Sequence, residues 1–510
     1  MLGSLILLWI GLWFLFFLFR TQRPKNFPPG PRPIPVFGNL LQLNLVNPMN
    51  DLEKLAGRYG KVFSLYIGSR PAVVISGMQA MKEALVTRSV EFAGRPQDLM
   101  VNHVTKSKGV ILANYGPDWR EHRRFTLMTL RNFGLGKQTM EERILGEIRH
   151  ISLWLERSAG KSMEPHHLFA NATSDIICSI LFGSRYEYED EAFQSFITMM
   201  EENAKITNGP WAMLYDTLPL LRNLPLPFRK AFQNYYSVQE HVLGIVKQHK
   251  RTRIPGQPRD LTDCYLDELE KRYTLVSHVK WKILSRFPCQ RCESGSSFDE
   301  SQMVALLLDL LFAGTETTSN TLLTAFLYLM THPDVQERCQ REIDTVLGEK
   351  EQASYEDRHR MPYMQAVIHE VQRVADTVPL SVFHATTKDT QLMGFDIPKG
   401  TLIIPNLSSV LSEESQWKFP HDFNPENFLN QQGEFVKPEG FMPFSVGPRV
   451  CLGEGLARME LFLILVTLLR RFQFVWPEDG GVPDYAPVFG VTQAPKPYRL
   501  CVRLRGTQRG

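Results

Sequence analysis

A ten-residue segment near the end of the chain, FSVGPRVCLG from Phe444 to Gly453, holds a cysteine in an unusual setting. Cys451 comes just before EGLARMELFLILVTLLRRF, an apolar stretch with the period of a helix. The dipole and free N–H groups at the start of that helix would stabilise a thiolate. Gly447 and Gly453 would let the backbone pack closely around the sulfur. If the sulfur binds a ligand, Arg449 could pair with a carboxylate on that ligand.

A thiolate beside a flat, acidic ligand is typical of proteins in which a cysteine is the axial ligand of haem iron. For Cys451 alone, an ordinary position in a loop would be the favoured interpretation. The complete ten-residue pattern is more specific than a lone cysteine. The segment therefore predicts haem binding, with Cys451 as the metal ligand.

A second candidate is the segment DLLFAGTETTSNTLL, which is helical in pattern but has a glycine and polar residues at its centre. Such a glycine costs about 1 kcal/mol relative to alanine. Asp309, Ala313 and Thr317 are four residues apart and share a face, where small residues leave room for a ligand. The hydroxyl of Thr317 beside the carboxylate of Glu316 suits proton delivery to dioxygen. A local kink, with threonine bonding to its own backbone, is the alternative.

Together these segments resemble the cytochrome P450 superfamily, and the resemblance covers nearly the whole chain. Phe-x-x-Gly-x-Arg-x-Cys-x-Gly is that family's haem loop. Its other motifs follow in the expected order: Trp-x-x-x-Arg at Trp119 to Arg123, the oxygen-binding motif at Ala313 to Thr318, and Glu-x-x-Arg at Glu370 to Arg373. The chain looks most like the vertebrate microsomal enzymes of the second P450 family, which oxidise drugs, fatty acids and similar lipophilic compounds.

The resemblance implies roles for individual residues. It makes Glu316 and Thr317 catalytic, and it places Phe444 and Gly453 in the loop around the haem. The positions that hold the acidic haem propionates correspond to Trp119, Arg123, Arg449, His384 and Arg95. The pocket positions correspond to the segment from Val101 to Ile111 and to Asp309, Phe312, Ala313, Val378 and Val491.

The roles of Asp309 and of the pair Glu370 and Arg373 are open questions. The carboxylate of Asp309 could favour basic substrates, or it could bind backbone N–H groups of the loop from Val101 to Ile111. Glu370 and Arg373 are three residues apart on a predicted helix and can form an ion pair, which contributes little if it is exposed. The resemblance makes the pair a buried structural network with Asn427. Many members have arginine or histidine there, so we expect a weaker network, because an amide adds no charge.

The chain begins with an apolar segment that precedes the elements carrying these motifs. Leu2 to Phe19 carries no charge and would span about 27 Å as a helix. Arg20, Arg23 and Lys25 follow it, which favours a retained anchor with the rest of the chain in the cytosol over a cleaved signal peptide. We therefore predict a transmembrane signal-anchor at residues 1–20 and a stiff proline-rich hinge at residues 21–39.

Residues 40–510 are predicted to form one catalytic domain that is mainly α-helical with a smaller β part. Alternation in KVFSLYIGSRPAVVIS predicts a β-hairpin from Lys61 to Ser76. Residues 271–297 lack a clear period and are predicted to be an inserted surface loop. Cys289 and Cys292 lie within it, but they lack the further ligands of a zinc site.

Composition restricts the function further. The net charge of +3 and the lack of long basic runs predict no nucleic-acid partner. Seven scattered cysteines do not form a disulfide framework and indicate a reducing compartment. The sequence thus predicts a haem-thiolate monooxygenase with haem b and a lipophilic substrate, at the cytosolic side of the endoplasmic reticulum membrane. The expected electron source is NADPH through NADPH–cytochrome P450 reductase, with cytochrome b5 as a second candidate donor.

Several alternatives remain open at this point. Arg120, Arg124, Arg131 and Lys137 could form a basic docking face for the reductase or a merely solvated face. The protein could instead be a non-catalytic or defective haem binder, which the insertion and Asn427 suggest. It could also rearrange a peroxide without external electrons.

Overall fold

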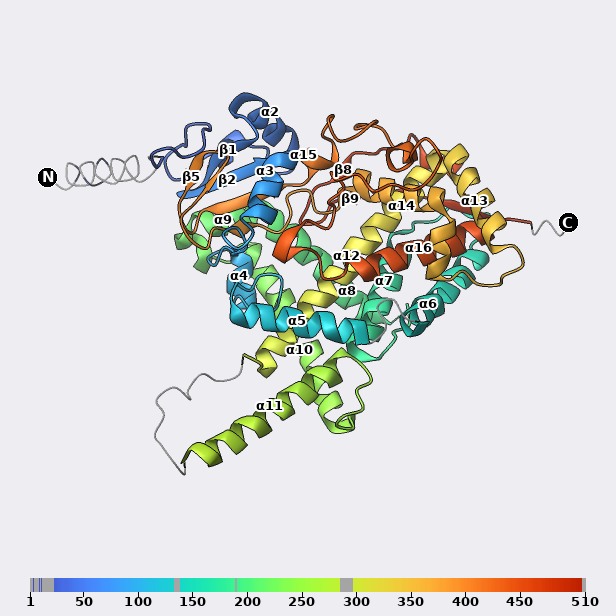
Figure 1. Cartoon of the computed structure of the whole chain (residues 1–510), viewed down its shortest axis with the longest axis horizontal. Helices are drawn as coiled ribbons and strands as arrows, with labels where there is room; N and C mark the ends of the chain where they lie inside the picture. The colour runs from blue at the N-terminus through green and yellow to red at the C-terminus, as the bar shows by residue number, and fades with distance from the viewer. Residues whose placement is uncertain are drawn as a thin grey trace.

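The computed structural model describes residues 23–132, 138–188, 190–284 and 297–506, together with Gly3, Trp9 and Gly11. Its described part is mainly helical with small sheets, as predicted (Figure 1). The helices are α2 (Met49–Tyr59), α3 (Met78–Lys82), α4 (Met100–Thr105), α5 (Pro117–Asn132), α6 (Gln138–Arg157), α7 (His166–Phe182), α8 (Glu191–Asn208), α9 (Pro210–Thr217), α10 (Phe228–Thr252), α11 (Leu261–Leu284), α12 (Glu300–Thr331), α13 (Pro333–Leu347), α14 (Pro362–Ala375), α15 (Ser408–Leu411) and α16 (Glu454–Arg471).

The strands are β1 (Val62–Ile67), β2 (Arg70–Ser76), β3 (His384–Ala385), β4 (Thr390–Leu392), β5 (Phe395–Ile397), β6 (Leu402–Asn406), β7 (Phe472–Val475), β8 (Pro487–Val488), β9 (Ala494–Pro495) and β10 (Cys501–Leu504). The largest sheet has the order β1-β2-β6-β3. In it β1 and β2 form the predicted hairpin, with Val62 opposite Ile75, which confirms that prediction. β2 pairs in parallel with β6, so a late segment of the chain lies beside an early one.

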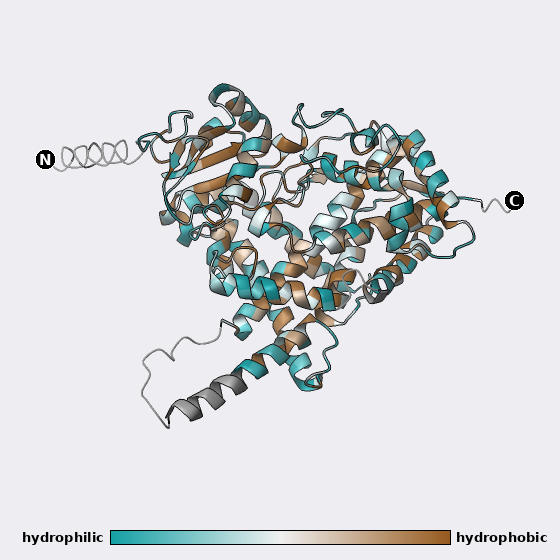
Figure 2. Ribbon diagram, in the orientation of Figure 1, coloured by the Kyte–Doolittle hydropathy of each residue, from teal (hydrophilic) through white to brown (hydrophobic). Residues whose placement is uncertain are grey.

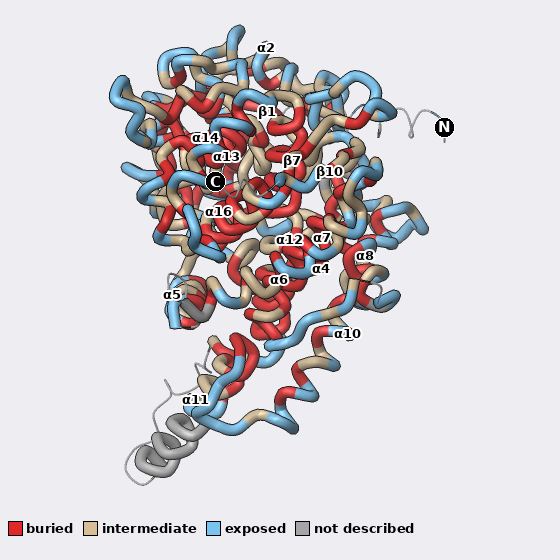
Figure 3. Tube along the Cα trace, turned by 90° about the vertical axis from the view of Figure 1, so that its right-hand side faces the viewer, coloured by how far each residue is buried: buried red, intermediate tan, exposed pale blue. Residues whose placement is uncertain are grey.

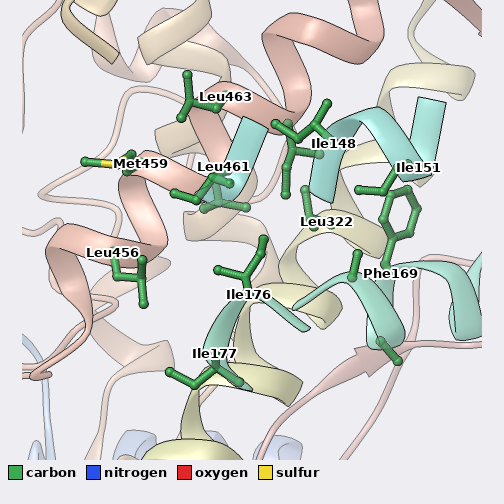
Figure 4. Close-up of a cluster of buried hydrophobic side chains, with 14 of the residues drawn as sticks. Ile148, Ile151, Phe169, Ile176, Ile177, Leu322, Leu456, Met459, Leu461 and Leu463 are labelled. Carbon is green, nitrogen blue, oxygen red and sulfur yellow. The ribbon is translucent and has the colours of Figure 1, made fainter. Parts of the chain in front are cut away.

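The long helix α12 runs through the centre of the molecule (Figure 1). Its side chains are buried over most of its length because other helices cover several of its faces. Figure 3 shows the buried segments gathered in the interior. Figure 4 shows part of this core, to which α7 contributes Ile176 and Ile177, α12 contributes Leu322 and α16 contributes Met459. Burial of such side chains contributes about 1.5–3 kcal/mol each and fixes α12 in place.

The proline-rich segment that precedes the domain packs against the sheet. Ser64 of β1 donates its backbone N–H to Pro29 O at 2.7 Å and its hydroxyl to Pro28 O at 2.7 Å. Asn39 and Tyr66 exchange further hydrogen bonds at the end of the segment. From Pro28 onward the predicted hinge therefore lies on the domain as part of its surface, beside strands that Figure 2 shows to be strongly hydrophobic.

No helix within the described ranges is both long and apolar enough to cross a membrane. The anchor predicted at residues 1–20 lies outside those ranges except for Gly3, Trp9 and Gly11.

The segment predicted to be a surface loop is helical in its first part. α11 continues to Leu284, and residues 285–296, with both cysteines of the segment, lie outside the described residues. The helix continues because residues 271–284 contain neither glycine nor proline to end it. Both ends of the segment contact α5. Arg272 pairs with Glu121 at 2.7 Å, and Ser297 hydrogen-bonds to the same carboxylate.

A buried polar network joins α14 to the short turn Pro425–Phe428. Glu370 is fully buried and accepts two hydrogen bonds from Arg373, at 2.7 and 2.8 Å. Asn427 donates its amide to both Glu370 oxygens at 3.2 and 3.3 Å, and it accepts from Phe419 N at 2.9 Å. Burial raises the pKa of Glu370, whereas Arg373 lowers it. The structure thus brings the three residues of the predicted network together.

We expect Glu370→Gln to destabilise the fold by about 3–5 kcal/mol, because it leaves the buried Arg373 without its counter-charge. The measurement is urea denaturation of the complete protein, followed by tryptophan fluorescence.

Glu426→Gln is the matched control, because Glu426 forms an exposed ion pair with Arg338 at 3.0 Å in the same region. An exposed pair contributes about 0–1 kcal/mol. Equal losses in the two variants would contradict a special role for the buried pair.

Candidate active site

Cys451 lies between the turn Gly447–Arg449 and the start of α16. Its Sγ accepts the N–H of Gly453 at 3.3 Å, and its own N–H donates to Phe444 O at 3.0 Å. Burial raises the pKa of the thiol, whereas the N–H groups of Gly453 and Glu454 and the Arg123 guanidinium lower it. Cys451 is nevertheless exposed. Burial around the thiol and exposure of the residue agree if the sulfur faces a space that the protein encloses. Such a position suits a cysteine that binds the metal of a cofactor.

The two glycines of the loop have different roles. Gly447 has a φ of +80°, and a Cβ there would lie 2.0 Å from Leu85 O, so only glycine fits. The close neighbour of Gly447 is therefore the Leu85 carbonyl, and its packing around the sulfur stays a prediction. A Cβ at Gly453 would lie 3.9 Å from the Cys451 sulfur, which is an ordinary contact.

Three arginines lie beside this loop, of which Arg95 and Arg449 are buried and Arg123 is partly buried. Arg449 donates to Ala93 O at 2.9 Å and to Ala113 O at 2.8 Å, and its guanidinium lies 4.0 Å from the Trp119 ring centre. Arg123 donates to Val450 O. Arg95 donates to the carbonyls of Ile111, Val382 and Phe383, each at 2.8 Å. Trp119 donates to Val110 O at 2.9 Å.

The charge of this arginine cluster calls for an anionic ligand. Burial and repulsion by neighbouring arginines lower the pKa of Arg95 to about 9 and that of Arg449 to about 8. Asp309 is the carboxylate that offsets the charge of Arg95. Buried cations that outnumber their counter-charges are unfavourable unless an anion joins them. A ligand with two carboxylates would supply it, so these residues fit haem with its two propionates.

His384 adjoins the arginine cluster from strand β3. Its Nδ1 lies 2.6 Å from Phe92 O. Burial lowers its pKa well below the usual value, and the charges of Arg95 and Arg449 lower it further. The imidazole is therefore neutral in this setting. All five residues predicted to hold the propionates thus belong to one region of the structure.

On α12, Thr317 donates its hydroxyl to Ala313 O at 2.7 Å, the backbone bond that was the alternative expectation. Glu316 accepts the hydroxyl of Thr492 at 2.8 Å, and burial raises the pKa of its carboxyl to about 7. A carboxyl with this pKa can both take and give a proton near neutral pH.

The central glycine of α12 has a packing role that the sequence did not reveal, because a Cβ at Gly314 would lie 2.9 Å from a side-chain atom of Ile177 on α7.

Asp309 holds the loop that follows α4. Its Oδ2 accepts the N–H groups of Val110 and Ile111 at 2.7 and 2.9 Å. Gly109 has a φ of +86°, and a Cβ there would lie 2.1 Å from the same oxygen. Burial raises the pKa of Asp309 to about 7. The carboxylate of Asp309 therefore positions the loop, which was the second of the two expectations, and the placement of Asp309 in the substrate pocket stays a prediction.

The predicted apolar pocket residues lie on or beside α12. Phe312, Ala313, Val378 and Val491 are all partly buried. The segments that carry the two valines meet where Gln493 donates its N–H to Thr377 O at 2.8 Å. Thr377 in turn lies 3.2 Å from the Thr321 hydroxyl, one turn of α12 after Thr317.

Sequence reasoning missed two residues that hold α12. Thr492, which bonds Glu316, lies in an irregular segment far along the chain and gave no local signal. Glu460 is buried on α16 and bonds the Thr318 side chain, and burial raises its pKa to about 8. Its signal was a lone carboxylate in the otherwise apolar stretch MELFLIL.

A basic depression of about 510 Å³ lies on the outer face of α5, beside the cysteine loop. Its lining includes Arg120, Arg124 and Arg131, together with Pro448 of the loop. Lys137, the fourth predicted member of this face, lies outside the described residues.

Comparison with known proteins agrees with this geometry. The family model described as "Cytochrome P450" matches residues 28–502. The chain is 43% identical over 491 residues to "Cytochrome P450 2D3" of Rattus norvegicus, covering 95% of both proteins. It is 43% identical to "Cytochrome P450 2D10" of Mus musculus, over 95% of this chain and 94% of that protein. It is 40% identical to "Cytochrome P450 2F2" of Rattus norvegicus, over 98% of this chain and 99% of that protein. The chain therefore belongs to the cytochrome P450 family and is a haem-thiolate monooxygenase.

Proposed function

We propose that this enzyme inserts one atom of dioxygen into a lipophilic organic compound (a xenobiotic, fatty acid or steroid) with electrons from NADPH–cytochrome P450 reductase. The observation that carries the proposal is the setting of Cys451, whose sulfur accepts a backbone N–H beside the arginine cluster. Haem, when bound, supplies the activation of dioxygen and its transfer to the substrate. The names of the relatives, which belong to groups 2D and 2F, support the same class of enzyme.

The residues of the chain divide the remaining work. Cys451 would bind the haem iron through its sulfur, and the arginine cluster with Trp119 would hold the haem carboxylates. Asp309 fixes the loop that supplies carbonyls to that cluster. Glu316 takes up and releases protons near neutral pH, and Thr317 presents a hydroxyl on the next residue of α12. This acid–alcohol pair argues against a peroxide-rearranging enzyme, which needs no delivered protons.

The pocket supports a lipophilic substrate more than a cationic one. Phe312, Ala313, Val378 and Val491 offer apolar surface. The carboxylate of Asp309, one turn before Ala313 on α12, is bound to two backbone N–H groups. A basic substrate would have to compete for that carboxylate with the loop.

The membrane location also belongs to the proposal. Leu220 and Leu224, which follow α9, are 90% and 45% exposed. Phe37 of the proline-rich segment is also exposed, at 37%. Figure 1 shows α9 and the N-terminal segment on the same side of the molecule. Exposed apolar side chains that gather on one side favour contact with a bilayer. Together with the predicted anchor, they support attachment to the endoplasmic reticulum membrane with the catalytic domain in the cytosol.

The basic depression on α5 supports reductase docking on the cysteine side. Its arginines stand next to Pro448, so a negatively charged partner there would lie close to the cysteine loop. The same face would serve cytochrome b5 as a second donor.

We expect Cys451→Ala to lose haem or to lose the red-shifted absorption band of the reduced carbon monoxide complex, because the alanine has no sulfur to bind iron. The measurement is the spectrum of the reduced protein under carbon monoxide. Cys501→Ala is the control, since Cys501 is a half-buried free cysteine in β10. A red-shifted band that survives in Cys451→Ala would exclude Cys451 as the ligand.

We expect Thr317→Ala to keep NADPH consumption roughly constant while product per NADPH falls and hydrogen peroxide rises. The hydroxyl is lost, but alanine preserves the helix. Positioned proton transfer contributes about 10²-fold or more, so the change should be easy to measure unless water replaces the hydroxyl.

Thr324→Ala is the control for Thr317→Ala, because Thr324 lies on the same helix and makes the same type of bond, to Asn320 O at 2.9 Å. Product, peroxide and NADPH are measured together with reductase and a substrate found by screening for spectral shifts. Unchanged coupling in a correctly folded Thr317→Ala protein would remove Thr317 from the mechanism.

We expect the double reversal Arg124→Glu and Arg131→Glu to lower the rate of reduction by the reductase several-fold, and most strongly at low salt, because it reverses the charge of the docking face. The control Lys399→Glu reverses an exposed charge after β5. Direct reduction by dithionite should be unaffected. Equal effects of the double variant and the control would identify the basic depression as an ordinary solvated face.

A further inference from the structure

A small cavity lies where α12 meets α7 and α8. Its volume is about 30 Å³, and its lining includes Glu316 of α12, His166 and Ala170 of α7, and Glu201 of α8. A water molecule needs about 10–15 Å³ of such volume and two to four polar partners. The cavity therefore has room for one or two waters, with an imidazole and two carboxylates around them.

The two ends of the cavity differ in their access to solvent. His166 Nδ1 lies 3.8 Å from Glu201 Oε1, and these side chains are 42% and 25% exposed, so this pair forms the outer end. Glu316 is the inner end. The Thr492 hydroxyl holds one of its oxygens at 2.8 Å, and Thr317 is the next residue of the helix.

The charges around the cavity suit the movement of protons. Burial raises the pKa of Glu316 to about 7, while Thr492 and Lys205 lower it and Glu201 raises it. Burial lowers the pKa of His166, and Glu201 opposes this shift. The other charged groups that face His166 are His167, Lys205 and Glu164. Glu316, whose carboxyl titrates near neutral pH, can therefore both accept and release a proton.

We propose that His166 and Glu201 are the solvent entry of a proton relay that supplies Glu316 through water in this cavity. The relay rests on the proposed monooxygenase function. In each transfer the His166 imidazolium gives one proton to a cavity water, and that water gives one proton to the Glu316 carboxylate. His166 then regains a proton from solvent, with Glu201 stabilising its charged form. Atoms and charge balance, and the water is unchanged.

The first test removes the entry groups. We expect His166→Gln and Glu201→Gln to lower the ratio of product to hydrogen peroxide by about tenfold, less than the roughly 10²-fold of a complete positioned transfer because bulk water still reaches the site slowly. We also expect the solvent deuterium isotope effect on product formation to change in both variants. His167→Gln is the matched control, because His167 is an exposed neighbour that does not line the cavity. An equal effect in the control, or none in either entry variant, would overturn the relay.

The second test keeps every titratable group and removes the water. Ala170→Ile should fill the cavity and lower the product-to-peroxide ratio as the entry variants do. Ala170→Val serves the same purpose if isoleucine prevents folding. Crystal structures of the haem-loaded wild type and of the filled variant give a readout that is independent of activity. We expect an ordered water between Glu316 and the outer pair in the wild type and none in the variant. A wild-type cavity without water, or an unchanged ratio in a filled variant, would contradict the relay.

These outcomes separate the relay from the function on which it rests. A wild type that forms no product with NADPH and reductase would refute the proposed function itself. A wild type that forms product, with ratios and isotope effects unchanged in the His166 and Glu201 variants, would refute the relay alone.

Discussion

Repulsion among the guanidinium groups of buried Arg95 and Arg449 and partly buried Arg123 is the constraint on which the haem site depends. Arg123 lowers the pKa of Arg95, and Arg95 and Arg123 lower that of Arg449. Backbone carbonyls from distant segments accept the hydrogen bonds of Arg95 and Arg449. The positive charge remains after those bonds are made. An acidic ligand that binds the folded chain but not the unfolded chain therefore stabilises the fold as it completes the site. Haem thus has a structural role here as well as a chemical one.

α12 transmits that organisation to the rest of the molecule. Near its beginning, Asp309 holds the loop whose carbonyls bind Arg95 and Arg449. At its centre, Gly314 allows close packing on α7, while Glu316 is bound to the segment after β8. Thr318, on another face, bonds the buried Glu460 of α16, the helix that begins beside Cys451. One helix therefore sets the geometry of the cysteine side, the acid–alcohol pair and the pocket.

Local patterns in the sequence predicted what depends on neighbours along the chain. The cysteine loop before a helix and the hairpin of β1 and β2 are of this kind. The contacts that were missed join residues far apart, such as Thr492 with Glu316 and Gly447 with the Leu85 carbonyl. No spacing along the chain reveals them. The helical part of residues 271–297 was missed because the segment has no apolar period. The absence of that period indicates only that a helix there has no buried face. A helix can continue without a buried face where no glycine or proline ends it.

The expectation of a weaker network at Asn427 depends on how charge is counted in a buried site. Glu370 and Arg373 carry opposite single charges and exchange two hydrogen bonds. A cationic side chain at position 427 would add an attraction to Glu370, but it would also bring a second positive charge into the interior, where desolvation costs several kcal/mol. The amide of Asn427 donates to Glu370 without that cost, and its oxygen accepts Phe419 N at 2.9 Å, which a cation could not do. The network is therefore neutral overall, and asparagine is a compatible third member of it.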